Sequence, residues 1–262
     1  AAEPLKRLLR TNLTDHWRRC RCAMPRRGPA RGLRSYDGDT MTLNVYALCP
    51  ASQRWAVAQA AGVAPLTSPP LRLGTRQAAG LDPGLLEGRD LLYLALHGLP
   101  GEPYWYGDGA MTALSTAAFR GAHDGRPLAL RNTVVFVASC HFTEGPFFAA
   151  LLACRPRALI AGSGENYARS LSLVGPHLLG YYLRRALEAG LLPRLALEMA
   201  KARLRGATRR LQSASDGADR GHPADRAGQG KAFPRPRPGG AAARLAEDIA
   251  ANRDALRFEV LA

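Results

Sequence analysis

Two apolar runs in this sequence each end at a side chain suited to nucleophilic or acid–base chemistry. The run "LLYLALHG" ends at His97 and Gly98, and the run "VVFVASC" ends at Cys140, 43 positions after His97. A thiolate can attack a carbonyl carbon, and a nearby imidazole can exchange protons with the thiol and with the leaving group. The two residues are therefore candidates for a catalytic dyad, with Cys140 as nucleophile and His97 as general acid/base.

The two side chains can act together only if the fold brings them to one place. The apolar runs are unbroken rather than alternating, which favours strands covered on both faces, and helical patterns separate them. We therefore predict an α/β fold of three layers, with a mostly parallel central sheet flanked by helices. Ligands bind beyond the carboxyl ends of such strands, so His97 and Cys140 are expected there on adjacent strands. The backbone N–H groups of Gly98 and Cys140 are candidates to bind the developing oxyanion.

The pattern of apolar residues, glycines and prolines predicts the order of the elements along the chain. Strands are expected at 41–50, 90–98, 133–140 and 156–164. Helices are expected at 52–62, near 112–121, and at 145–154, 174–190 and 192–206. The segment 63–74 is predicted to be a connection or an edge strand, and "GEPYWYGDG" is predicted to be a loop.

Composition divides the chain into four parts. Residues 1–40 form a basic N-terminal lead, and residues 41–205 form the α/β domain. Apolar content collapses in residues 206–240, which predicts a disordered or long-loop insertion. Residues 241–262 predict a helix and a strand that return to the domain.

The formal net charge of +15 is confined to two segments of the 262-residue chain. Residues 1–35 carry ten Lys or Arg and two acids, and residues 201–240 carry ten and three. Such basic arms suit nucleic acid or an anionic surface, but Arg-rich, Ala-rich composition is also typical of solvated segments, so nucleic-acid binding is only a lesser alternative. The five cysteines lack the spacing of a disulfide framework, which favours the cytoplasm, and we expect no membrane span.

With these motifs in order, residues 85–205 resemble a CHAT domain, the caspase-like cysteine peptidase fold that also includes separase. The matching motifs are a strand ending in His-Gly, a polar loop with a small helix, a strand ending in "ASC", and then a helix, a strand and two helices. The resemblance implies a cysteine endopeptidase whose partner is a protein or peptide substrate. It implies that His97 is the general acid/base, Cys140 the nucleophile and Gly98 an oxyanion donor.

Two departures from the family pattern concern the substrate pocket. The loop after the nucleophile, "CHFTEG", is longer than usual, and "AGSGENYARS" lacks the Trp and the paired Asp that shape a pocket for a basic P1 residue. The family still favours Arg or Lys at P1, with Glu165 as the nearest acid and Asp108 and Glu144 as alternatives. Arg169 lies in the same segment as Glu165 and would instead favour an acidic P1 residue.

Other classes of protein fit some of the same residues. A caspase-like scaffold without turnover could bind partners through its basic arms, and a regulatory partner or an upstream domain is compatible with this sequence. Adjacent Cys140 and His141 also occur in DJ-1/PfpI-like cysteine hydrolases, but that interpretation leaves His97 and Gly98 unexplained and places bulky Phe142 at the nucleophile's turn. Cys20 and Cys22 lack the further ligands of a zinc site, so we predict no metal and no cofactor.

Overall fold

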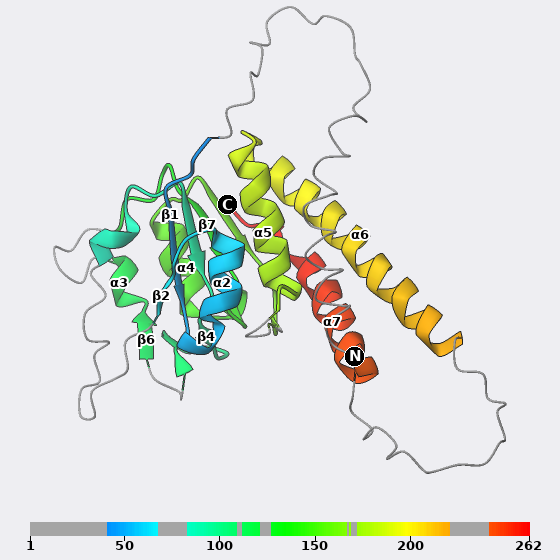
Figure 1. The fold of residues 1–262 in the computed structure, drawn as a ribbon. Coiled ribbons are helices and arrows are strands. Elements are labelled where there is room, and N and C mark those ends of the chain that lie inside the picture. The colour runs from blue at the N-terminus through cyan, green and yellow to red at the C-terminus, as the bar shows by residue number, and fades with distance from the viewer. Residues whose placement is uncertain are drawn as a thin grey trace, which may run out of the picture. The chain divides into compact units, whose positions relative to one another are not determined.

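Six strands form the central sheet of the computed structural model, in the order β2-β1-β3-β7-β8-β9 (Figure 1). The structure describes residues 41–67, 83–108, 112–120, 127–166, 168, 172–220 and 241–262. The strands are β1 (Val45–Cys49), β2 (Leu66–Thr67), β3 (Leu91–Leu94), β7 (Val134–Val137), β8 (Ala158–Ala161) and β9 (Glu259–Val260). The first five in this order run parallel, and β9 is antiparallel to β8. A mostly parallel sheet is confirmed.

Helices cover both faces of this sheet, because successive strand residues point to opposite sides and both sets are apolar. One core contains Tyr93 and Phe136 together with α2 (Arg54–Ala61), α5 (Gly175–Glu188) and α6 (Pro193–Arg220). The other core contains Leu94 and Val137 together with α3 (Ala117–Arg120) and α4 (Pro146–Ala153). The predicted arrangement of a central sheet between helices is therefore confirmed.

A second, smaller sheet lies between β3 and β7 in the chain, and the sequence did not predict it. Its strands β4 (His97–Gly98), β5 (Tyr104–Tyr106) and β6 (Thr112–Ser115) are antiparallel neighbours. The predicted loop "GEPYWYGDG" therefore contains a strand, and the helix expected near 112–121 is reduced to the short α3. The buried Trp105 ring stacks on Phe147 of α4 at 4.0 Å between centroids, which anchors the small sheet to the larger one.

The helix pair at the end of the domain is longer than predicted. Residues 206–220, expected in a disordered or long-loop insertion, instead continue α6 to Arg220. Buried Leu204 and Thr208 hold the middle of this helix against its neighbours, and the Thr208 hydroxyl donates to the Leu204 carbonyl. The remaining residues, 221–240, lie outside the described part of the chain.

The C-terminal segment supplies an edge strand and the helix before it. α7 (Ala241–Asp254) packs against α5 and α6, and β9 pairs with β8 after a short 3₁₀ turn, η6 (Ala255–Arg257). Buried Phe258 lies next to Gly162, just beyond β8. Within the described residues, no helix is both long enough and apolar enough to span a membrane.

Candidate active site

His97 lies just beyond the carboxyl end of β3, but it does not belong to that strand. β3 ends at Leu94, and three residues later His97 begins β4 of the small sheet. The turn between them is fixed to the neighbouring strands: Ala95 N–H donates to the Leu48 carbonyl, and Leu96 N–H donates to the Ser139 hydroxyl at 3.2 Å. The chain thus leaves the sheet in a defined direction and exposes the imidazole to solvent.

Cys140 follows β7, the parallel neighbour of β3, as predicted. β7 ends at Val137, and Ala138 N–H donates to the Leu94 carbonyl at 2.7 Å, so the pairing of the two strands continues past their ends. Cys140 then begins a turn in which it is partly buried. The two candidate catalytic residues therefore leave the same edge of the sheet from adjacent strands.

Gly98 brings these two segments into direct contact. A Cβ atom on Gly98 would lie 2.1 Å from the backbone carbonyl oxygen of Cys140, closer than any real contact allows. Because consecutive Cα atoms are about 3.8 Å apart, this contact places the Cα atoms of His97 and Cys140 within about 10 Å of each other. This separation is short enough for a substrate carbonyl to lie between the two residues.

The Cys140 thiol contacts the backbone of Asn166, in the loop after β8. Asn166 N–H donates to Sγ at 3.2 Å, and the thiol contacts the Asn166 carbonyl at 3.6 Å. The buried Asn166 side chain fixes this loop by donating to the Ser139 carbonyl at 2.9 Å. Burial raises the pKa of Cys140; the Asn166 N–H opposes this effect, and the charge of Glu165 adds to it. With its pKa raised in this way, the Cys140 thiol is expected to be protonated at neutral pH.

This protonation state predicts how the thiol reacts with iodoacetamide, which requires the thiolate. We expect alkylation of Cys140 to be slow at neutral pH and to accelerate through and beyond the ordinary thiol pKa. Glu165→Gln should increase the rate at a given pH, because it removes a charge that raises the pKa of Cys140. Mass spectrometry of the Cys140 peptide, followed over pH, makes the measurement.

Two buried cysteines provide an internal control for that experiment. Burial raises the pKa of Cys49 to about 12 and that of Cys154 to about 11. Their peptides should remain unlabelled while Cys140 reacts. A Cys140 labelling rate that is already maximal at neutral pH would contradict the protonated resting state.

The turn after Cys140 differs from a nucleophile elbow. In an elbow, the nucleophile itself occupies a strained turn between a strand and a helix. Of the described residues other than glycine, only His141 and Arg155 have positive φ, at 52° and 51°. His141 is hydrogen-bonded to Glu144 at 3.0 Å through Nδ1, and α4 begins only at Pro146. The strain thus lies one residue beyond Cys140, which does not favour the DJ-1/PfpI-like alternative.

The predicted substrate-binding residues have different environments. Glu165 is exposed and close enough for its charge to affect Cys140. The carboxylate of Asp108 accepts hydrogen bonds from the backbone N–H and the hydroxyl of Ser52, so it is already engaged within the protein. Glu144 is engaged by His141. Arg169 lies outside the described residues, as do Cys20 and Cys22.

Three residues of this site were not identified from the sequence. Asn166 and Ser139 position the Cys140 turn, and Ser52 binds Asp108. Asn166 and Ser139 carry a recognisable signal, because each is a polar residue within a few positions of the carboxyl end of a buried strand. Ser52 is likewise a polar residue shortly after the carboxyl end of a strand, in this case β1. Their partners, however, are distant in sequence and depend on strand order.

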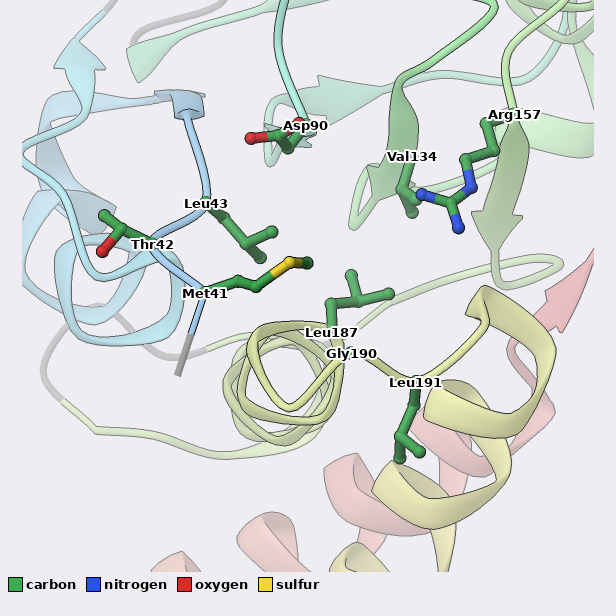
Figure 2. Close-up of a pocket in the computed structure, with 9 residues that line it drawn as sticks. All are labelled: Met41, Thr42, Leu43, Asp90, Val134, Arg157, Leu187, Gly190 and Leu191. Atoms are coloured by element: carbon green, nitrogen blue, oxygen red, sulfur yellow. The ribbon is translucent and has the colours of Figure 1, made fainter. Parts of the chain in front are cut away.

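Neither His97 nor Cys140 lines either of two cavities in the described structure. The first, about 190 Å³, lies at the amino ends of the strands, where Leu43, Val134 and Arg157 surround it together with residues of the α5–α6 turn (Figure 2). It is smaller than typical ligand pockets, which exceed about 300 Å³, and lies at the edge opposite Cys140. The second, about 310 Å³, adjoins the loops beyond β7 and β8 through Thr143 and Ser163. Its other lining residues belong to β8 and to the C-terminal segment around β9.

The chain matches no protein-family model, no curated protein and no solved structure.

Proposed function

We propose that this protein is a cysteine endopeptidase of the CHAT, caspase-like class, with Cys140 as nucleophile and His97 as general acid/base. The observation that carries the proposal is the backbone contact between Gly98 and Cys140, which joins the ends of two adjacent parallel strands. The order of the elements also supports it: β3, the His-Gly pair, a small helix, β7, the cysteine, α4, β8 and the α5–α6 pair. This is the order that the resemblance implies.

The two side chains can carry out a complete acyl-transfer cycle. Sγ bonds to the substrate carbonyl carbon as the thiol proton passes to the His97 imidazole, and the carbonyl electron pair moves to oxygen. The imidazolium then protonates the amine as the C–N bond breaks, which leaves a thioester. Water then gives a proton to His97 as its oxygen bonds to the thioester carbon. The C–S bond breaks as the imidazolium returns a proton to sulfur, which releases the carboxyl product and regenerates the thiol. The backbone N–H groups of Gly98 and Cys140 are the proposed oxyanion donors.

The protonated resting thiol fits a mechanism in which deprotonation accompanies substrate binding. It also favours a second candidate function, a caspase-like scaffold that binds partners without turnover, because the thiol is occupied by the Asn166 backbone. The three cysteines of the described residues are free, and a thiol nucleophile persists in a reducing compartment. We therefore place the proposed activity in the cytoplasm.

For specificity, we propose a basic P1 residue recognised by Glu165. Its carboxylate is exposed and near Cys140, whereas the carboxylates of Asp108 and Glu144 already have partners. A guanidinium can form two charge-assisted hydrogen bonds with a carboxylate, which gives both affinity and orientation.

The P1 assignment is tested with fluorogenic peptides that differ only at P1. We expect hydrolysis after Arg or Lys, and we expect Glu165→Gln to reduce it by about 10- to 100-fold. The same substitution should accelerate alkylation of Cys140, so opposite effects in the two assays separate lost recognition from a damaged thiol. Cleavage after Asp that survives Glu165→Ala and disappears with Arg169→Ala would overturn the basic P1 residue.

A further inference from the structure

The carboxylate of Asp108 is fixed by a turn on a different part of the chain. Ser52 N–H donates to Oδ2 at 2.9 Å, and the Ser52 hydroxyl donates to Oδ1. Ser52 lies in the 3₁₀ turn η2 (Ala51–Gln53), directly after β1. Asp108 follows β5 of the small sheet. The contact therefore ties the segment beyond β5 to the carboxyl edge of the central sheet, where the candidate site lies.

Two further hydrogen bonds connect the η2 turn to β3 through His177. Gln53 Oε1 is hydrogen-bonded to His177 Nε2 at 3.2 Å, and His177 Nδ1 is hydrogen-bonded to the Tyr93 hydroxyl at 2.9 Å. His177 and Tyr93 are both fully buried, and burial lowers the pKa of His177 to about 4. The neutral histidine therefore connects η2 to β3, the strand that leads to His97. Ser52, which binds Asp108, therefore lies in a turn that hydrogen bonds through buried His177 fix to the central sheet.

Two independent observations place Asp108 beside His97. In the β4–β5 ladder, His97 pairs with Tyr106, and Asp108 lies two positions further along the chain. β5 ends at Tyr106 and Asp108 lies in the turn that follows, so its Cα is within about 8 Å of the Cα of Tyr106, the residue that pairs with His97. Electrostatics agree: burial acts to raise the pKa of Asp108, but the hydrogen bonds from Ser52 and the charge of His97 lower it overall.

We infer that Asp108 positions the His97 imidazole for the reaction proposed above, and that Ser52 fixes Asp108 in this role. An imidazole that exchanges protons with a thiol and a leaving amine must present one ring nitrogen to them. A carboxylate that accepts a hydrogen bond from the other nitrogen selects the tautomer and the ring orientation. Asp108 is thus a positioning residue rather than part of the P1 pocket. The inference rests on the proposed function.

A purely structural role for Asp108 makes different predictions. As a simple anchor for η2, it would affect folding, and any loss of activity would follow the loss of stability. Asp108→Asn retains the size of the side chain and one carbonyl oxygen for the Ser52 N–H, but it removes the charge. Asp90→Asn is the matched control, because Asp90 is also exposed and accepts a backbone N–H, from Asn44 at 2.7 Å, at the opposite edge of the sheet.

The kinetic test compares kcat, KM and melting temperature for these variants on the Arg-P1 peptide. We expect Asp108→Asn to lower kcat by about 100-fold with KM changed less than about twofold, because the lost interaction orients the proton-transfer step. Asp108→Glu should recover part of kcat, Ser52→Ala should lower it by only several-fold, and Asp90→Asn should leave it unchanged. The inference would be overturned if Asp108→Asn left kcat unchanged. It would also be overturned if kcat fell in proportion to the melting temperature and Asp108→Glu recovered none of the lost kcat.

A spectroscopic measurement decides the inference even if the protein hydrolyses no peptide. Long-range ¹H–¹⁵N correlation spectra at alkaline pH report the tautomer of each histidine, and His97→Gln identifies the signals of His97. We expect Asp108→Asn to change the ring-nitrogen pattern of His97, while His141, held by Glu144, keeps its own. A His97 pattern unaffected by this substitution would exclude the contact with Asp108. An inactive wild-type protein with the expected spectral change would refute the proposed function alone.

Discussion

Replacement of Cys140 by Ala is expected to abolish amidase activity, with a fall in kcat of about 10³-fold or more. The reason is that the other described thiols are buried and hard to ionise: Cys49, at the end of β1, and Cys154, after α4, have pKa values raised to about 12 and about 11. His97→Ala should have a comparable effect, because it removes the proposed general acid/base. Initial rates on the Arg-P1 peptide measure both.

Both variants should remain folded, so the loss can be assigned to chemistry. Neither side chain fills a core position, and the expected change in the free energy of unfolding is on the order of 1–2 kcal/mol. Cys140→Ser is the conservative control: it keeps the size of the side chain and a donor for the Asn166 carbonyl, yet should also be inactive. Wild-type turnover in Cys140→Ala would show that the nucleophile is wrongly assigned. A wild-type protein without hydrolysis of any peptide would favour the scaffold.

Gly98→Ala is expected to damage both the site and the fold. The added Cβ would lie 2.1 Å from the Cys140 carbonyl oxygen, and this neighbour is backbone, which cannot rotate away. The two strand ends must therefore separate. We expect a loss of about 3 kcal/mol in the free energy of unfolding, as in overpacked cores. We also expect a fall in kcat of about 100-fold, since displacements of about 1 Å have that effect on oriented reactions.

Gly145→Ala supplies the matched control for this substitution. Gly145 also borders the site, but its φ is −127°, and an added Cβ would approach no atom more closely than 3.7 Å. This variant should retain stability to within about 1 kcal/mol. Chemical denaturation and initial rates, measured side by side, complete the comparison. Equal behaviour of the two variants would show that the Gly98–Cys140 contact is not close in solution.

The central sheet was predictable because its signal is local. The runs "LLYL", "VVFV" and "ALIA" are short, unbroken and separated by helical patterns, and parallel pairing brings their carboxyl ends to one edge. That rule was sufficient to predict the neighbourhood of His97 and Cys140. The small antiparallel sheet was not predictable in this way. Its strands have two to four residues, and Trp105 is fixed by stacking on Phe147, which is distant in sequence.

The state of the thiol also depends on contacts that sequence patterns do not contain. Asn166 reaches Cys140 across 26 residues, and Ser52 reaches Asp108 across 56. Both contacts follow from strand order rather than from the residues nearby. The continuation of α6 past residue 205 was missed for another reason. Low apolar content argues against a buried core, but Arg, Ala and Gln are good helix formers, and a helix once nucleated by packing extends through them.

The pairing of β3 with β7 has an evolutionary consequence. Leu91 to Leu94 pair with Val134 to Val137, and this ladder brings the ends of the two strands to one edge, where the chain continues to His97 and Cys140. Everything between the two strands, including the small sheet, forms an excursion that begins and ends at fixed points. His97 itself lies near the start of this excursion, so insertions or deletions are expected to leave the two candidate residues in place only where they fall beyond the β4–β5 pairing. Such changes would alter the surroundings of His97 and Cys140 while the strand pairing beneath them is retained.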